Sequence, residues 1–275
     1  MSTKKTQTTQ SSLGSADRRQ RVQSAETGMD VLKALSRLGG AASLTAVSSA
    51  IDESTAKVHR YMASLLSSGL VAQNSVTQHY YLASEALQIG LAALRQCDPI
   101  RLGESSLVRL RESLEVTCFI AVMGNKGPTV LRIEEPTLPV TVNIRLGSVL
   151  PVLWSAAGQA FLAYTNDPQI LKQAEEEFEG ASEEQKALLA GADPISQLRR
   201  QVKAQGCAIV HDMLLRGISA ISAPIFDSTG KVTAVLVALG ASRGFDTRPG
   251  GRICPEVMRE ASSISKAMGF ESLSN

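Results

Sequence analysis

Residues 55–67 carry two cations and a hydroxyl at helical spacing. On a wheel of about 3.6 residues per turn, these side chains share one uncrowded side of the segment with a small residue; the set is Ala56, Lys57, Arg60 and Ser64. Arginine and lysine bind guanine O6 and N7 or a phosphate, and a small residue lets the backbone approach the bases. The spacing therefore predicts a surface that enters the major groove of DNA.

The opposite side of this segment is apolar and is expected to pack against other helices; it holds Val58, Met62, Leu65 and Leu66. His59 lies at the edge between the two sides, as a base contact or simply as a packed or solvated residue. Tyr61 on the other flank is placed to donate a hydrogen bond to a phosphate. Any amphipathic helix of a helical domain would give the same pattern, so spacing alone leaves both interpretations open.

Ser155, His211 and Asp212 are residue types that hydrolases use, but no G-x-S-x-G surrounds Ser155. Adjacent residues of a strand point to opposite faces, so His211 and Asp212 are not expected to act together. The four cysteines have no C-x-x-C spacing and the chain has three histidines, which disfavours metal chemistry and fits free thiols in a reducing cytoplasm. We therefore expect no enzymatic activity, no metal and no cofactor.

Three short helices are expected to position the cationic segment. Ser24 is the expected cap of the first helix, which ends at Gly39-Gly40, and Ser43 is the expected cap of the second. The third helix runs from Thr55 to Ser67. Two short helices separated by a tight turn are typical of a helix-turn-helix.

A hairpin and a longer helix follow. Residues 70–72 and 79–82 favour strands and flank the polar stretch 73–78, which predicts a wing. A helix from Ser84 ends near Pro99, where a linker between domains is expected. The remainder alternates between helix and strand, as in an α+β domain. Its expected elements are a helix at 101–115, strands at 117–123, 129–134 and 139–145, helices after Trp154 and across 168–205, a hairpin pairing 218–226 with 231–239, and a closing helix at 253–269.

Charge is distributed unevenly along the 275 residues. Residues 1–82 hold nine Lys/Arg and five Asp/Glu, a net charge of +4, whereas residues 83–275 hold 19 and 21, a net charge of −2. Residues 1–23 are expected to be disordered, as a solvated tail or as a basic arm that adds phosphate contacts. The apolar stretch around 232–241 is too short to cross a bilayer, and no secretory signal is recognisable. A cytoplasmic protein that does not enter membranes is expected.

Four segments resemble the IclR-type transcription regulators in order and spacing. They are Ala56–Val71; Tyr81-Leu82 with Leu87-Gln-Ile-Gly90; Arg145-Leu-Gly147 with Pro151 and Ala157–Ala163; and Gly206 with Gly217–Asp227 and Gly230. The resemblance spans about residues 25–270 and implies an N-terminal winged helix-turn-helix, a linker helix and a C-terminal GAF-like α+β effector-binding domain. It also implies homodimers or homotetramers on palindromic, double-stranded DNA operators.

The resemblance further implies an effector pocket between the sheet and the helices that follow Gly147. Some carboxylate-sensing members have polar side chains where this chain has Val210, Ala220, Val237 and Leu239. An apolar pocket floor favours an aromatic or otherwise hydrophobic metabolite, since a small keto acid would lack polar partners there. The backbone amides of Ala156 and Ala157 at a helix start remain suited to one anionic group. The four apolar residues are equally consistent with ordinary core strands.

The expected organisation is an arm at 1–23, a winged helix-turn-helix at 24–83, a linker helix at 84–99 and an effector domain at 100–270. The expected function is a sequence-specific transcriptional regulator whose operator affinity responds to a small-molecule effector. The alternative is a sensor or scaffold of the same architecture that does not bind DNA. The cationic side of residues 55–67 favours the regulator, because a scaffold has no reason to keep it.

Overall fold

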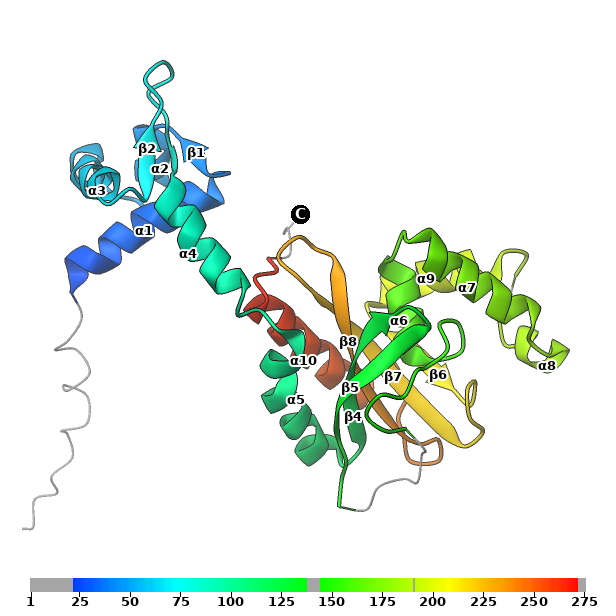
Figure 1. The fold of residues 1–275 in the computed structure, drawn as a ribbon. Coiled ribbons are helices and arrows are strands. Elements are labelled where there is room, and N and C mark those ends of the chain that lie inside the picture. The colour runs from blue at the N-terminus through cyan, green and yellow to red at the C-terminus, as the bar shows by residue number, and fades with distance from the viewer. Residues whose placement is uncertain (1–21, 138–143, 190, 272–275) are drawn as a thin grey trace, which may run out of the picture. The chain divides into compact units, whose positions relative to one another are not determined.

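A computed structural model describes residues 22–137, 144–189 and 191–271. The chain divides into two compact units, Met1–Arg95 and Gln96–Asn275 (Figure 1). The expected arm at 1–23 lies almost wholly outside the described residues, and so does most of the strand expected at 139–145. Ile144 and Arg145, the described residues of that segment, are not in a strand.

The first unit is a helix-turn-helix followed by a hairpin. Its helices are α1 (Gln23–Arg37), α2 (Leu44–Ala50), α3 (Thr55–Ser67) and α4 (Ser84–Leu94). Three short antiparallel strands form a sheet in the order β1-β3-β2, namely β1 (Ala41–Ala42), β2 (Val71–Gln73) and β3 (Tyr80–Leu82). The hairpin β2–β3 is the predicted wing, and β1 adds an edge strand that the sequence did not predict.

Local sequence explains two of the first three helix starts. Ser43 Oγ accepts the Ala46 N–H at 3.2 Å, and Ser54 Oγ accepts the Lys57 N–H at 3.4 Å. The expected cap at Ser24 is wrong: α1 begins at Gln23 after Val22, with no side-chain cap, so Ser24 lies inside the first turn. The first turn of α1, residues 23–26, is exposed and has no side-chain cap, and the first buried residue of the helix is Val31.

The first unit has a small apolar core of its own. Val31 and Leu35 of α1, Val47 of α2 and Val58 and Met62 of α3 are each completely buried. Leu65 joins them, but Leu66, expected on the same side, is 38% exposed. The apolar side of α3 is therefore narrower than the sequence pattern predicts.

The second unit is a five-stranded antiparallel sheet between two layers of helices (Figure 1). The strand order is β5-β4-β8-β7-β6, with β4 (Thr117–Gly124), β5 (Gly127–Glu134), β6 (Ala208–His211), β7 (Ile218–Phe226) and β8 (Val232–Ala241). The helices are α5 (Pro99–Leu114), α6 (Ala156–Tyr164), α7 (Pro168–Glu179), α8 (Glu183–Lys186), α9 (Pro194–Gln205) and α10 (Ile253–Ala267). The stretch 168–205 thus forms three helices, because Gly180 and Pro194 interrupt it.

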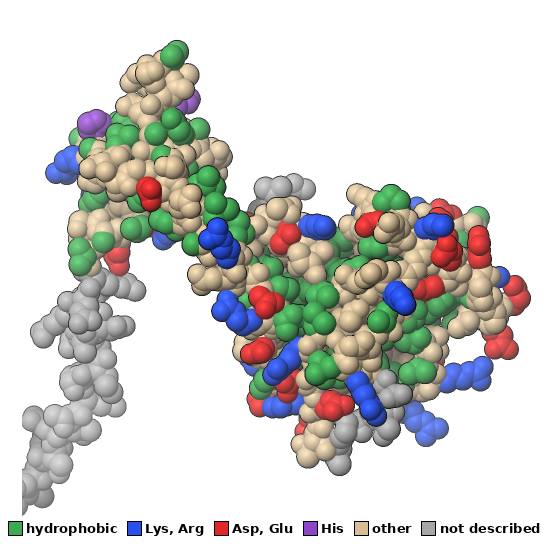
Figure 2. All heavy atoms as spheres, in the orientation of Figure 1, with side chains coloured by type: hydrophobic (Ala, Val, Ile, Leu, Met, Phe, Trp, Pro, Cys, Tyr) green, Lys and Arg blue, Asp and Glu red, His purple; other side chains and the backbone are tan. Residues whose placement is uncertain are grey.

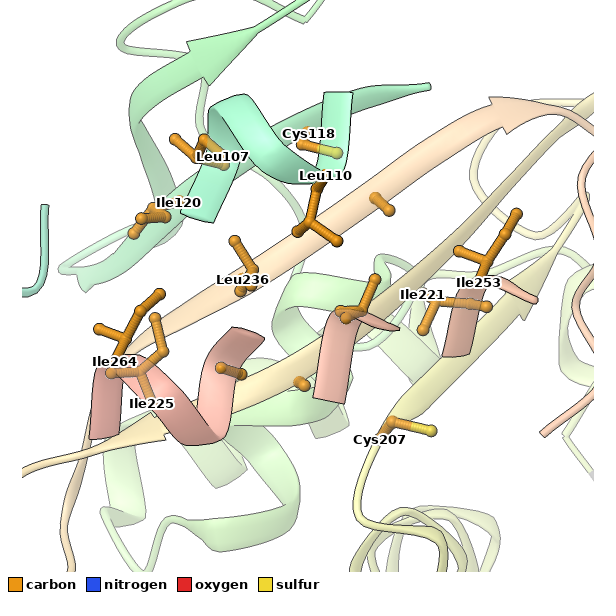
Figure 3. Packing of buried hydrophobic residues seen from close by; sticks show 14 of the residues in the cluster. Leu107, Leu110, Cys118, Ile120, Cys207, Ile221, Ile225, Leu236, Ile253 and Ile264 are labelled. Atoms are coloured by element: carbon orange, nitrogen blue, oxygen red, sulfur yellow. The ribbon is translucent and has the colours of Figure 1, made fainter. Parts of the chain in front are cut away.

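Each face of the sheet has its own hydrophobic core. Leu107 and Leu110 of α5 and Ile264 of α10 pack on the face that carries Ile221 and Leu236 (Figure 3). The other face packs against α6 and α9 through a second cluster; it includes Phe119, Ala157, Ala160, Phe161, Val202, Val237 and Leu239. Because α6 packs on this second face, its first turn lies against the sheet.

One ion pair with a buried carboxylate joins α5 and α10, the two helices that pack on the same face of the sheet. The carboxylate of Glu260 in α10, 5% exposed, accepts a hydrogen bond from Arg109 of α5 at 2.6 Å. Burial by itself would raise the pKa of Glu260, but hydrogen bonds from Arg109, Ser106 and Arg259 outweigh it, and the net pKa is lowered. The carboxylate is therefore charged and fully partnered where α5 crosses α10.

Candidate DNA-reading surface and effector cavity

The exposed side of α3 is a narrow strip of small and cationic residues. Ala56, His59, Arg60 and Ser64 are all exposed, so four of the six predicted contact residues share one surface. Ala63, which the sequence analysis did not single out, lies exposed between them. Two alanines on the strip leave the backbone accessible, which suits a helix that enters the major groove.

The other two predicted contacts, Lys57 and Tyr61, lie on one flank of the strip and are partly buried. The Tyr61 ring packs towards α1, where its Cδ1 would lie 3.6 Å from a Cβ atom placed on Gly28. The Lys57 ammonium is bound by the Glu53 carboxylate at 2.5 Å. Among the described residues, no carboxylate lies within ion-pair distance of Arg60, so Arg60 is the unpaired cation of the strip.

Figure 2 shows few charged side chains on the visible face of the first unit and many on that of the second. Residues 22–95 hold five Lys/Arg and five Asp/Glu, so this described part of the first unit has no net basic charge. The cationic character of α3 therefore comes from single residues. Such a surface gives little non-specific attraction and leaves affinity dependent on a few placed contacts.

An apolar cavity lies between the sheet and the start of α6. It has an empty volume of about 420 Å³, counting the part open to solvent. All six residues predicted to bind the effector line it, namely Ala156, Ala157, Val210, Ala220, Val237 and Leu239. Seven further residues line the cavity that no sequence pattern indicated: Phe119, Ile144, Leu150, Ser155, Leu214, Leu215 and Ile218.

Strand register explains how the floor residues meet. Val210 of β6 is paired with Ala220 of β7, Ala220 is paired with Leu239 of β8, and Val237 is paired with Phe119 of β4. Residues paired across neighbouring antiparallel strands have side chains on the same face. Four strands therefore contribute one contiguous apolar floor.

The start of α6 lines one side of the cavity through Ser155, Ala156 and Ala157. Ser155 Oγ accepts the Gly158 N–H at 3.0 Å and donates to the Pro151 carbonyl at 2.6 Å. The N–H groups of Ala156 and Ala157 belong to the first turn, so no helix carbonyl is available to them. Among the described residues, neither has another acceptor. Ser155 is thus a helix cap whose hydroxyl proton is already donated to the Pro151 carbonyl.

The loop before α6 is held from outside by one carboxylate. Glu177 of α7 accepts the N–H groups of Val152 and Leu153, each at 2.8 Å. Gly158 follows where α6 packs against this loop, and a Cβ atom there would clash with the carbonyl oxygens of Pro151 and Val152. The helix start that lines the cavity is therefore rigidly placed.

His211 and Asp212 lie together, contrary to the sequence expectation. Their side chains approach to 3.5 Å because β6 ends at His211 and Asp212 adopts a left-handed conformation, with φ of 54°. The Ser242 hydroxyl and the Gly217 N–H donate to Asp212, and they lower its pKa against the opposing effect of burial. Asp212 thereby closes the loop that carries Leu214 and Leu215, one wall of the cavity.

The buried thiols of Cys118 and Cys207 are protonated. Burial raises the pKa of the Cys118 and Cys207 thiols to about 12, so neither is a thiolate at neutral pH. Within the described residues, no group of three His, Cys, Asp or Glu side chains is placed to hold a metal ion. No helix in the described part of the chain is long and apolar enough to span a membrane.

A winged helix with an exposed cationic strip, together with a separate apolar cavity, defines a ligand-responsive DNA-binding regulator. Two family models match this division of the chain. Residues 24–75 match the IclR helix-turn-helix domain, and residues 92–266 match the bacterial transcriptional regulator IclR C-terminal domain. The chain belongs to the IclR family of transcriptional regulators, with a DNA-binding helix-turn-helix and a C-terminal effector-binding domain.

Individual relatives agree with this assignment. The crystal structure of HmgR from Pseudomonas aeruginosa is similar with a TM-score of 0.83 and 37% identity, over 91% of this chain and 100% of that one. The repressor AllR of Klebsiella pneumoniae is 24% identical over 90% of this chain and 91% of its own. BlcR from Agrobacterium tumefaciens, at 16% identity and a TM-score of 0.74 over 91% of this chain and 99% of its own, shares the fold.

Proposed function

We propose that the exposed strip of α3 reads the operator and that the apolar cavity binds the effector that controls operator affinity. The observation that carries this proposal is the convergence of Val210, Ala220, Val237 and Leu239, from three strands, beneath the free N–H groups of α6. We infer no catalytic role, because Ser155 is committed as a cap and His211 and Asp212 close a loop.

Arg60 is the residue of the strip with the greatest influence on DNA affinity. Its guanidinium is exposed and has no ion-pair partner among the described residues, so binding DNA breaks no existing interaction. It binds either guanine O6 and N7 or a phosphate. Ala56 and Ser64 lie one helical turn before and after it, and His59 lies beside it.

The Arg60→Ala variant tests this role on operator DNA selected from a random pool. A lost base contact costs about 1–3 kcal/mol and relaxes the preference at one base pair, whereas a lost phosphate contact weakens all sequences and lowers the salt slope by about one. Arg37, exposed at the end of α1, gives a matched control variant, Arg37→Ala. Unchanged binding by Arg60→Ala in both assays would end the proposal for α3.

The effector is an aromatic or otherwise hydrophobic metabolite with one anionic group. Phe119, Val237 and Leu239 offer an apolar surface, and Ser155 is the one polar side chain among the described lining residues. An anion has a place only at the Ala156 and Ala157 N–H groups, where the helix dipole also favours negative charge. A small keto acid would have no apolar part to fill the floor.

Leu239→Ser tests the ligand class, because it puts a hydroxyl into the floor and leaves every residue of α6 unchanged. In calorimetric titrations with benzoate, phenylacetate and glyoxylate, we expect the native protein to bind an aromatic acid and the variant to bind it at least tenfold more weakly. Val232→Ser, on the same strand but outside the cavity, is the matched control. Binding of glyoxylate alone would overturn the proposed ligand class.

The regulator is proposed to act in the cytoplasm as a homodimer or homotetramer. No residue of α4 is buried, and its large apolar side chains Leu87, Ile89, Leu91 and Leu94 are 60%, 62%, 37% and 50% exposed. Such a helix is suited to pairing with a second copy. Paired units would contact half-sites about one helical turn of DNA apart, or a multiple of it. Sedimentation of the native chain and of Leu91→Glu measures this association.

A further inference from the structure

The ion pair between Glu53 and Lys57 stands at the end of α3 that enters DNA. Glu53 Oε1 lies 2.5 Å from Lys57 Nζ, and the two side chains are 32% and 31% exposed. In helix-turn-helix proteins the N-terminal residues of the second helix contact base edges. Lys57 belongs to the first turn of α3, and Glu53 comes just before its cap, Ser54.

The backbone holds Glu53 in this place. Its N–H donates to the Ser48 carbonyl of α2 at 3.1 Å, and the preceding Asp52 has a left-handed φ of 51°. The Ser54 hydroxyl caps the Lys57 N–H on the next turn. The carboxylate and the ammonium are therefore presented together by a fixed turn, rather than by a mobile loop.

A carboxylate at this position opposes DNA binding unless a base donates to it. Phosphates on both sides of the groove repel the Glu53 carboxylate, and the carboxylate neutralises the positive charge of Lys57. The N4 amino group of cytosine is a major-groove donor that glutamate accepts, and guanine O6 and N7 are acceptors that lysine reaches. In one C·G pair, N4 and O6 are hydrogen-bonded to each other and lie about 3 Å apart.

We propose that Glu53 and Lys57 together select a C·G base pair, with Glu53 on cytosine N4 and Lys57 on guanine O6 and N7. The spacing of the two charged groups matches the spacing of the donor and acceptor in that pair. An A·T pair also offers a donor and an acceptor. Its N6 amino group lies between the acceptors O4 and N7, however, so the lysine ammonium reaches one acceptor there instead of the two neighbouring acceptors of guanine. This inference rests on the proposed reading by α3 and names a residue that determines its specificity.

The sharpest test replaces the carboxylate with an amide of the same shape. Glutamine binds adenine N6 and N7 with two hydrogen bonds, so Glu53→Gln should change the preferred base at one position from C·G to A·T. Anisotropy titrations of the full chain, with each operator position varied in turn, should show a change in preference of about 5- to 150-fold at that position. Asp30→Asn removes an acid paired with Lys33 on α1 and should change no base preference.

Two other results would overturn the proposal. A uniform gain in affinity for all sequences, with a salt slope steeper by about one, would make Glu53 an electrostatic brake that merely occupies Lys57. No change at any position would make the pair a helix-stabilising surface contact, which is worth little. Arg60→Ala, measured on the same DNA, separates these outcomes from failure of the α3 proposal itself, since only that failure leaves Arg60→Ala unchanged.

Discussion

Ser219 and Ser222 stand three residues apart on β7, and both side chains are completely buried. Their hydroxyls are treated in opposite ways. Ser219 Oγ is hydrogen-bonded to His211 Nδ1 and to Ser242 Oγ, each at 2.8 Å. Ser222 Oγ has no hydrogen-bond partner among the described residues. The Ser219 hydroxyl therefore stabilises the sheet edge near the cavity wall. The Ser222 hydroxyl loses its hydration on folding and gains no hydrogen bond in exchange.

Alanine variants of the two serines should have opposite effects on stability. Ser219→Ala leaves His211 and Ser242 without their shared partner and should lower the free energy of unfolding by about 1–3 kcal/mol. Ser222→Ala removes an unpaired buried hydroxyl and should raise it by about 1 kcal/mol. Urea unfolding of the two variants measures both changes. An equal loss of stability in both variants would mean that the Ser222 hydroxyl makes a stabilising hydrogen bond, which would contradict this prediction.

At the scale of elements, the start of α6 depends on one close approach. Gly158 packs so tightly against the loop at 151–154 that no larger residue fits. Gly158→Ala should destabilise the second unit by about 1–3 kcal/mol, because the loop and the helix must move apart. Its matched control is Gly28→Ala, in α1.

Gly28 has ordinary room, since a Cβ atom there would meet Tyr61 Cδ1 at 3.6 Å. The added methyl group should raise stability by about 0.5–1 kcal/mol through its helix propensity. Thermal unfolding followed by circular dichroism distinguishes the two glycines. A stable Gly158→Ala variant with normal effector binding would contradict the rigid placement of α6.

The sequence predicted most elements because their patterns are local. A few neighbouring residues are enough to show the cap at Ser43, the helical periodicity of α3 and the turn of the hairpin β7–β8. The strand β1 pairs through only two residues, Ala41 and Ala42, which is too short for any pattern. Local patterns also failed at Ser24, because α1 begins one residue earlier, at Gln23, without any side-chain cap.

The binding surfaces were less accessible to prediction than the elements. The family-like segments pointed to the floor residues of the cavity, but Phe119 and Leu150 come from distant segments that only register and tertiary packing bring there. On α3 the polar side was found from its spacing, yet the pairing of Lys57 with Glu53 depends on the turn before the helix. A helical wheel of α3 cannot show this pairing, because Glu53 lies in the turn before the helix begins.

At the scale of the whole molecule, the first unit carries the exposed strip of α3 and the second carries the cavity. An effector changes DNA affinity only if it binds one arrangement of the regulator more tightly than another. The coupling is reciprocal, so the operator must change effector affinity by the same factor. The helix α4 ends at Leu94, next to the boundary between the units, and we propose that it transmits such a change.

The most direct test of this account measures operator affinity as an aromatic acid is added to the full chain. We predict that an acid that binds the native cavity changes the operator dissociation constant by about 5- to 150-fold. In Leu239→Ser, affinity without ligand should stay native while the response at the same acid concentration is lost. Operator affinity that does not respond to any acid bound in the cavity, or responds equally in native protein and Leu239→Ser, would contradict the account.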